Sequence, residues 1–255
     1  MQDMPVVFVG HGSPMNAIED NGFTRSWERL GEELPTPQAI LCVSAHWFTR
    51  GTKTPDDPQP QTVHDFYGFP EALYRIEYPA PGSPDWAHAT VALLDGRAQI
   101  DNSWGIDHGT WSVLRRTFPK ADIPVYQLSV DAGASAQEHY AIGETLAPLR
   151  KQGVLIVGSG NVVHNLGMVD WSSEGGFPWA DEFDQYIRDA VLSGDHGKVI
   201  DYRQAGSAAR LAVPTPDHFA PLVYALGAAG TEGSVETFNE ARTMGSLSMT
   251  GYVFV

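Results

Sequence analysis

The chain has 255 residues, of which 42% are hydrophobic and 11% aromatic, so enough apolar material is present for a full core and a disordered chain is excluded. Its 31 acidic residues against 16 Lys plus Arg give a formal net charge of -15. Such a charge would repel phosphate backbones and anionic lipid surfaces, so we expect neither nucleic acid nor a membrane as a partner.

The first apolar segments along the chain are short and strand-like. Residues 1–5 contain no basic stretch, and the apolar run after them is too short for a signal peptide or a spanning helix, so we expect a cytoplasmic protein. The single cysteine, Cys42, excludes an intrachain disulfide and a cysteine-based zinc site, and its apolar neighbours indicate an inert core position. Runs of strand length recur at 5–9, 39–44, 123–130 and 153–157.

Helix-like stretches alternate with these runs, which predicts an α/β fold with parallel strands. Asn21, Ser83 and either Thr215 or Asp217 are candidate N-caps. The predicted helices cover 23–34, 84–94, 110–117, 136–150, 179–192 and 216–227, and two strands at or near the sheet edge cover 234–240 and 247–255. With no repeat or linker visible, we expect one domain over residues 1–255, with the loops 51–63 and 170–178 bordering the active site.

Four histidines lie at the ends of predicted elements. His11 and His46 each follow an apolar strand, His164 follows a glycine-rich turn after another strand, and His218 precedes the last helix. His11 or His46 alone would indicate a hydrogen-bonded core histidine, but this pair, with His164 and His218 in similar positions, favours metal ligation. A neutral imidazole suits zinc, iron, copper or nickel, and long-range spacing does not choose among them.

The remaining histidines carry weaker signals. His88, His139 and His196 have polar neighbours, which indicates solvated surface positions. His64 and His108 each sit beside an aspartate among aromatic residues, a cluster that could pack a flat ring or be ordinary aromatic packing. For His108 we favour the pocket interpretation, and for His64 both stay open. No GxxxxGK[ST], GxGxxG or GxSxG motif occurs, which argues against nucleotide binding and serine hydrolysis.

Seven ordered motifs together resemble the class III extradiol ring-cleavage dioxygenases of the DOPA 4,5-dioxygenase type. They are HGSPMN at 11–16, SAHW at 44–47, HDFYGFP at 64–70, YPAPG at 78–82, DHGTW at 107–111, GNVVHN at 160–165 and PDH at 216–218. The resemblance implies an α/β domain with a central mixed, largely parallel sheet flanked by helices, like the catalytic subunit of protocatechuate 4,5-dioxygenase. It also implies a non-haem Fe(II) and opening of a catechol ring, of DOPA or a related compound, by O2 to a muconic semialdehyde-type product.

The same resemblance assigns roles to the histidines. His11 and His46 correspond to two metal ligands, and His218 takes the place of the glutamate that completes the iron site in better-known members. His164 corresponds to a second-sphere acid/base over the bound O2, with a role as fourth ligand left open, and His108 to a catalytic, substrate-contacting residue. Further substrate contacts are expected from Ser13, His64 and Tyr224, with Arg50 a candidate for an amino-acid tail.

The sequence also allows another metal and other functions. An all-histidine site also binds zinc well, so we expect Fe(II) in the active form and Zn(II) as an occupant of purified protein. The alternatives are a zinc-dependent hydrolase, for which no HExxH-like helix supplies a base, and a non-enzymatic interaction protein on the same scaffold. The expected partners are a small catechol and O2, and the expected state is a monomer or homodimer.

Overall fold

A computed structural model describes residues 3–255; Met1 and Gln2, part of the segment considered above for a signal peptide, lie outside the described residues. The strands are β1 (Val6–Gly10), β2 (Ala39–Thr49), β3 (Thr52–Thr54), β4 (Ala98–Ile100), β5 (Val125–Asp131), β6 (Val154–Gly160), β7 (Val235–Phe238), β8 (Arg242–Thr243), β9 (Leu247–Ser248) and β10 (Gly251–Phe254). The α-helices are α1 (Gly22–Glu33), α2 (Glu71–Tyr74), α3 (Pro84–Leu93), α4 (His108–Thr117), α5 (Ala136–Leu146), α6 (Pro178–Leu192), α7 (His196–Ile200), α8 (Ser207–Ala212) and α9 (Ala220–Ala229). Short 3-10 helices are η1 (Pro14–Ala17), η2 (Ala147–Gln152), η3 (Leu166–Met168) and η4 (Tyr202–Ala205).

A six-stranded sheet with the order β5-β2-β6-β1-β10-β7 forms the centre of the molecule. Strands β5, β2, β6 and β1 are mutually parallel, and β10 and β7 continue the sheet in antiparallel pairing. The predicted α/β fold with a mixed, largely parallel sheet is confirmed, and β7 lies at the sheet edge as expected. That residues 1–255 are a single domain stays a prediction.

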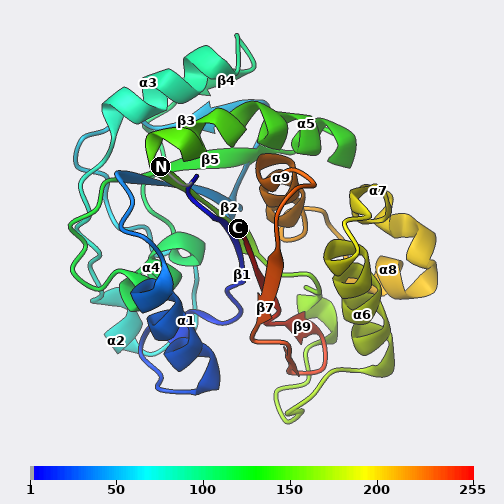
Figure 1. Cartoon of the computed structure of the whole chain (residues 1–255). Helices are drawn as coiled ribbons and strands as arrows, with labels where there is room; N and C mark the ends of the chain where they lie inside the picture. Colours follow the sequence, from blue (N-terminus) through cyan, green and yellow to red (C-terminus); the bar gives the residue numbers. More distant parts are fainter. Residues whose placement is uncertain (1–2) are drawn as a thin grey trace.

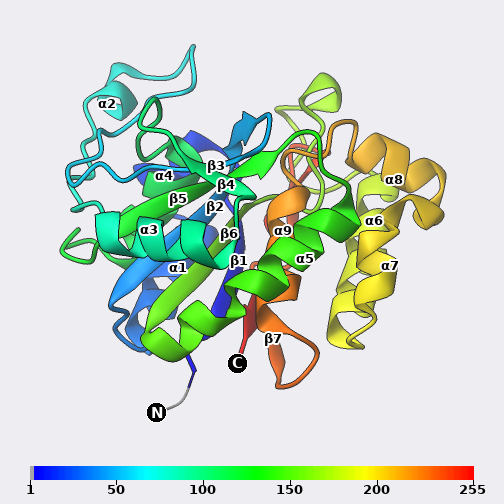
Figure 2. The same cartoon turned by 90° about the horizontal axis from the view of Figure 1, so that it is seen from above.

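Helices cover both faces of this sheet, with α3, α5, α6 and α9 on one side and α1 and α4 on the other (Figure 1). Alternating strand residues face opposite ways, so Leu41 joins the first core and Cys42 the second. Helices α5 and α9 lie side by side (Figure 2), and a Cβ at Gly143 would come within 2.2 Å of the Tyr224 carbonyl oxygen. A glycine is therefore required at this crossing.

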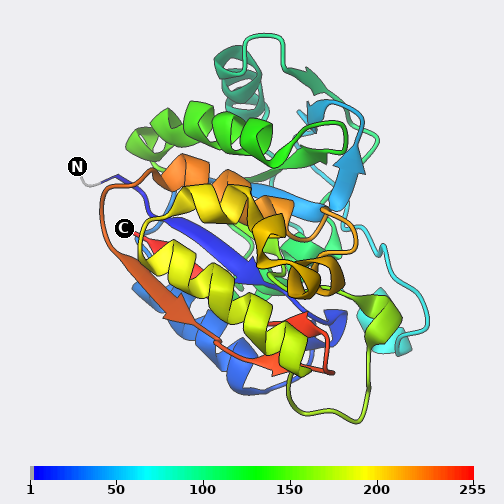
Figure 3. The same cartoon turned by 90° about the vertical axis from the view of Figure 1, so that its right-hand side faces the viewer.

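The C-terminal strands lie beside α6 (Figure 3), and a buried carboxylate of this helix binds the segment that carries them. Asp184 is 1% exposed and accepts hydrogen bonds from the Ser248 hydroxyl, from the Thr250 hydroxyl at 2.9 Å and from the Arg242 guanidinium at 3.3 Å. The hydrogen-bonded carboxylate fixes the segment that carries β8, β9 and β10 to the rest of the molecule.

Several element boundaries differ from the sequence prediction. Asn21 caps α1 as predicted, but the Ser83 side chain makes no capping hydrogen bond to α3. The helix predicted over 110–117 begins two residues earlier because the Asp107 carboxylate caps it, and the helix predicted over 136–150 changes to a 3-10 helix after residue 146. Residues 52–54 form β3 within the stretch predicted as a loop.

The last predicted helix starts four residues later than expected, at Ala220. Neither Thr215 nor Asp217 caps it, because its N-cap is Phe219 and the Asp217 carboxylate hydrogen bonds to the His218 ring instead. No helix among residues 3–255 is long and apolar enough to cross a membrane.

Two of the three histidines predicted at the surface are buried. His139 is 3% exposed and hydrogen bonds to the Asp131 carbonyl, and His196 is 7% exposed and pairs with the Tyr140 hydroxyl. The prediction was wrong because their polar neighbours point away while the two rings pack inward. His88 is exposed and Cys42 is buried, both as predicted.

Candidate metal centre

The carboxyl ends of the parallel strands bring three histidines to one edge of the sheet. His11 directly follows β1, and its backbone N–H donates to the Gly160 carbonyl at the end of β6, 3.0 Å away. His218 approaches the end of β6 from the segment before α9. A Cβ at Gly160 would come within 2.1 Å of the His218 carbonyl oxygen. The glycine therefore permits the close approach of His218 to the strand end.

His46 comes from an irregularity inside β2. The parallel register with β5 pairs Ser44 with Ser129 and then Phe48 with Val130, so residues 45–47 are extra on the β2 side. Such bulges turn a side chain out of the regular alternation and are frequent beside active sites. Here the bulge carries the His46 ring toward His11.

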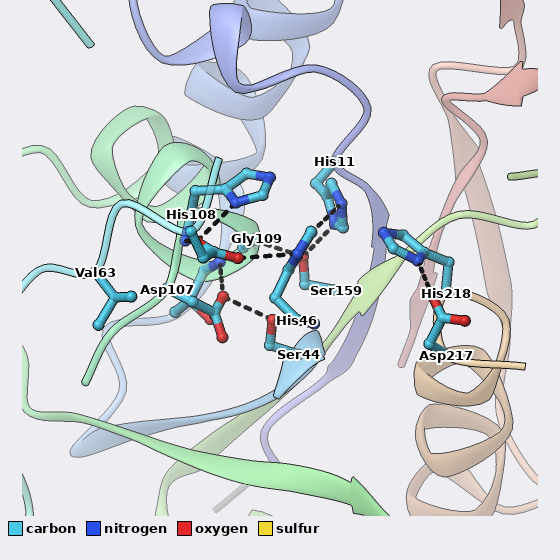
Figure 4. A network of polar contacts seen from close by, with 12 residues as sticks. His11, Ser44, His46, Val63, Asp107, His108, Gly109, Ser159, Asp217 and His218 are labelled. Atoms are coloured by element: carbon cyan, nitrogen blue, oxygen red, sulfur yellow. Dashed lines mark hydrogen bonds and ion pairs between the residues drawn. The ribbon is translucent and has the colours of Figure 1, made fainter. Parts of the chain in front are cut away.

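The three imidazoles face a common point (Figure 4). The Nε2 atoms of His11 and His46 are 3.1 Å apart, and one ring nitrogen from each of His11, His46 and His218 lies within 4.8 Å of the other two. The ring centroids are 4.9 Å apart for His11 and His46, 5.3 Å for His11 and His218 and 5.0 Å for His46 and His218. The structure thus brings together the three histidines that the sequence predicted as metal ligands.

The Nδ1 atom of each ring has a different hydrogen-bond partner. The Ser159 hydroxyl donates its one hydrogen to the Gly109 carbonyl, so its 3.0 Å contact with His11 requires His11 Nδ1–H as donor. The Nδ1 atom of His46 is 3.0 Å from the Asp65 carboxylate, and that of His218 contacts the Asp217 carboxylate. An ionised carboxylate only accepts, so these Nδ1 atoms also carry protons.

It follows that each of the three rings, when neutral, directs the lone pair of Nε2 into the same space. The Nε2 atom of His218 is buried without any hydrogen-bond partner among residues 3–255, and two lone pairs 3.1 Å apart repel each other unless a positive charge lies between them. Imidazoles oriented through the opposite nitrogen are characteristic of protein metal sites. The residues therefore fit a metal ion held by three histidines.

Charges around the cluster favour a cation. Burial, followed by neighbouring histidines, lowers the pKa of both His11 and His218 well below the ordinary value, which keeps these rings neutral and able to ligate. Burial alone would lower the pKa of His46, but its hydrogen bond to Asp65 and the nearby Asp107 raise it. The carboxylates of Asp65, Asp107 and Asp217 behind the rings compensate for a bound cation.

Two further histidines border this group. The His108 ring lies 3.9 Å from that of His46, and the His164 ring is stacked on that of His218 at 3.4 Å with 5° between their planes. Burial lowers the pKa of His164 to about 4, so the ring is neutral at neutral pH. The cluster thus has neutral nitrogen bases available beside the three candidate ligands.

The Asp107 carboxylate organises the His108 end of the cluster. It caps α4, accepts from the Ser44 hydroxyl and the Gln127 amide at 2.7 Å each, and accepts from the Trp104 indole at 3.1 Å. Next to it, a Cβ at Gly109 would lie 2.8 Å from Cδ2 of His46. The start of α4 is therefore packed directly against a candidate metal ligand.

The predicted substrate contacts are not all at the cluster. His64 hydrogen bonds to the Ile76 carbonyl at 2.9 Å within an aromatic group, and the Ser13 hydroxyl accepts from the Met15 N–H at 3.2 Å as cap of η1. Tyr224 is 1% exposed and stacks on His139 between α9 and α5, so its observed contacts lie elsewhere, and Arg50 is exposed.

Sequence reasoning missed the residues that orient the rings. Asp65 was noted only as a neighbour of His64, and Ser159 only as part of a glycine-rich turn. A signal for Asp65 was present, since carboxylates are frequent partners of metal-binding histidines. No local pattern identifies Ser159, whose partner His11 is 148 residues away.

Comparison with known proteins gives consistent matches over almost the whole chain. Residues 5–255 match the family described as "Catalytic LigB subunit of aromatic ring-opening dioxygenase". A protein of Escherichia coli K12 named 4,5-DOPA dioxygenase extradiol is 47% identical over 96% of this chain and 93% of that protein, and a Beta vulgaris protein of the same name is 39% identical over 97% and 95%. The crystal structure of an uncharacterized Escherichia coli K12 protein superposes with a TM-score of 0.86 at 42% identity, covering 99% of this chain and all of that one.

Proposed function

The chain belongs to the LigB family of aromatic ring-opening dioxygenases, and from this premise we propose that it is an extradiol dioxygenase that opens the ring of DOPA or a related catechol with O2. The observation that carries the proposal is that one ring nitrogen from each of His11, His46 and His218 lies within 4.8 Å of the other two, with the Nε2 atoms of His11 and His46 3.1 Å apart. We assign these three residues as ligands of Fe(II).

We propose iron rather than zinc because the reaction with O2 requires a redox-active metal. Opening a ring with O2 needs a metal that can change its oxidation state, and Zn²⁺ does not. When bound, the ion would lower the pKa of a catechol hydroxyl and bring the diol and O2 together. Zn²⁺ would still bind the same nitrogens tightly, because it stands above Fe²⁺ in affinity.

We assign the proton transfers to the neighbouring histidines. His164 is neutral at neutral pH and stacked against a ligand, so it can accept a proton from the substrate hydroxyl and later return it. His108, fixed at the start of α4 beside His46, is assigned as a contact to the catechol ring or its hydroxyls. Ser13 and His64 are further candidate contacts. Tyr224 is not assigned as one, because its ring stacks on His139 and its hydroxyl accepts the Asp131 backbone N–H at the end of β5.

Anaerobic reconstitution tests the proposal. The metal-free protein is loaded with Fe(II) or Zn(II) and mixed separately with DOPA, catechol, protocatechuate and caffeate; air is then admitted while O2 uptake and a new yellow absorbance are followed. We expect uptake with iron only. His218→Gln should abolish it, and His88→Gln, a matched change at an exposed histidine, should leave it unchanged.

Two other outcomes would replace the proposal. Metal-dependent cleavage of an ester or amide without O2 would indicate the zinc hydrolase, and absence of any turnover together with stable protein complexes would indicate an interaction protein. Cytoplasmic location and a monomeric or homodimeric state stay predictions.

A further inference from the structure

Asp65 lies between two histidines to which different tasks have been assigned. Its Oδ2 atom is 3.0 Å from Nδ1 of His46, and its Oδ1 atom is 2.8 Å from Nδ1 of His108. Oδ1 also accepts the backbone N–H of His108 at 3.0 Å. Both oxygens of one carboxylate are therefore occupied by the two rings.

The burial of this group makes the arrangement consequential. The side chains are 11% exposed for Asp65, 17% for His46 and 5% for His108, so little water is available to replace a lost hydrogen bond. Because an ionised carboxylate only accepts, it selects the Nδ1–H form in both rings at once and leaves both Nε2 atoms free. The same carboxylate therefore orients both rings.

From this geometry we infer that Asp65 is a positioning residue that couples a metal ligand to the substrate-contacting histidine. The inference rests on the proposed metal centre, and it adds that the aim of His46 and the aim of His108 are set together. In this arrangement one carboxylate would orient both the ring that would hold the ion and the ring assigned to the substrate.

Replacing the carboxylate by an amide separates the two functions. In Asp65→Asn the single acceptor oxygen is expected to stay with His108, where two donors meet it, so the NH2 group faces Nδ1 of His46. His46 must then carry its proton on Nε2 or turn away, and either change removes a ligand. We expect the affinity for Zn(II), measured by competition with a chelator, to fall about 10–100-fold, and the visible spectrum of the Co(II) form to lose the wild-type pattern.

A matched control and a double variant make the experiment specific. Asp57→Asn is the same change at a half-buried carboxylate that accepts from the Gln59 N–H, and it should leave Zn(II) affinity unchanged. His108→Phe removes one of the two donors that hold the amide oxygen and leaves only the backbone N–H of residue 108, so in Asp65→Asn/His108→Phe the oxygen turns to His46 more readily. The coupling predicts that the loss of Zn(II) binding free energy in the double variant is smaller than the sum of the losses in the two single variants.

Each result has a defined consequence. Wild-type affinity in Asp65→Asn would overturn the inference while leaving the metal centre intact, and strictly additive losses would overturn the coupling by showing that the effect of Asp65→Asn does not depend on the His108 ring. Absence of Zn(II) binding by the wild type would instead refute the proposed metal centre together with this inference. If Asp65→Asn does not fold, nitrogen-detected NMR of the zinc-loaded wild type decides: protons on Nδ1 of both His46 and His108 support the bridge, and an unprotonated His108 Nδ1 refutes it.

Discussion

Removal of the Ser159 hydroxyl should weaken both the fold and the metal centre. The side chain is 0% exposed, and Ser159→Ala would leave the His11 Nδ1–H and the Gly109 carbonyl without their present partners. A buried polar group without a partner costs about 1–3 kcal/mol, and the Gly109 carbonyl keeps its hydrogen bond within α4, so the unpaired His11 Nδ1–H should lower the free energy of unfolding of the metal-free protein by about 1–3 kcal/mol. His11 also loses the contact that directs Nε2 inward, and Zn(II) affinity should fall about 10–100-fold.

Urea unfolding of the metal-free protein and chelator competition for Zn(II) measure the two effects. Ser112→Ala is the matched control, because the Ser112 hydroxyl is buried in α4 without a hydrogen-bond partner among residues 3–255, and its removal should be neutral or slightly stabilising. The reasoning is refuted if Ser159→Ala unfolds at the same urea concentration as Ser112→Ala and binds Zn(II) as tightly as the wild type.

Three further outcomes are expected. Gly109→Ala should reduce Zn(II) affinity at least about tenfold, because the new Cβ would displace His46. Gly22→Ala is the control, because nothing lies within 4 Å of a Cβ at that position, and it should leave the affinity unchanged. Equal affinities of the two variants would contradict this packing argument. Burial lowers the pKa of His139, so the folded state prefers the neutral ring and stability is lost as the pH falls below the unfolded pKa of about 6.5. The urea midpoints of wild type and His139→Gln should therefore converge toward about pH 5. A difference between the midpoints that does not change with pH would disprove this linkage. Burial raises the pKa of the Cys42 thiol, so iodoacetamide should modify it only as urea unfolds the chain, and rapid labelling of the folded protein would count against an inert core role.

Local patterns were sufficient for much of the fold. Apolar runs predicted the four parallel strands because strands buried on both faces are continuously hydrophobic, and the capping side chain of Asn21 marked the start of α1. The position of His139 was also readable, since it precedes the buried Ile142 by three residues and Leu146 by seven, which places it on the core face of α5. Its polar neighbours were given too much weight.

The site was only partly within reach of the sequence. Strand ends predicted that His11 and His46 would meet, but the continuation of β2 through a bulge to Thr49 depends on pairing with β5, which no local pattern encodes. The partners of the rings were missed for the same reason, because Ser159 and Asp65 reach them only through tertiary contacts. Asp217 was one of two candidate helix caps, but its carboxylate hydrogen bonds to the neighbouring His218 ring, a use that its position in the chain equally allows.

The wide spacing of the three assigned ligands along the chain bears on when an ion is acquired during biosynthesis. His11 and His46 are 35 residues apart, and His218 follows His46 after a further 172 residues. In an unfolded polypeptide, binding one cation with all three histidines would close both long loops at once. The chain entropy lost in closing these loops makes the unfolded protein bind metal ions weakly. Metallation should therefore follow folding, so the choice between iron and zinc depends on the folded histidine site and on the ions that the cell supplies at that moment.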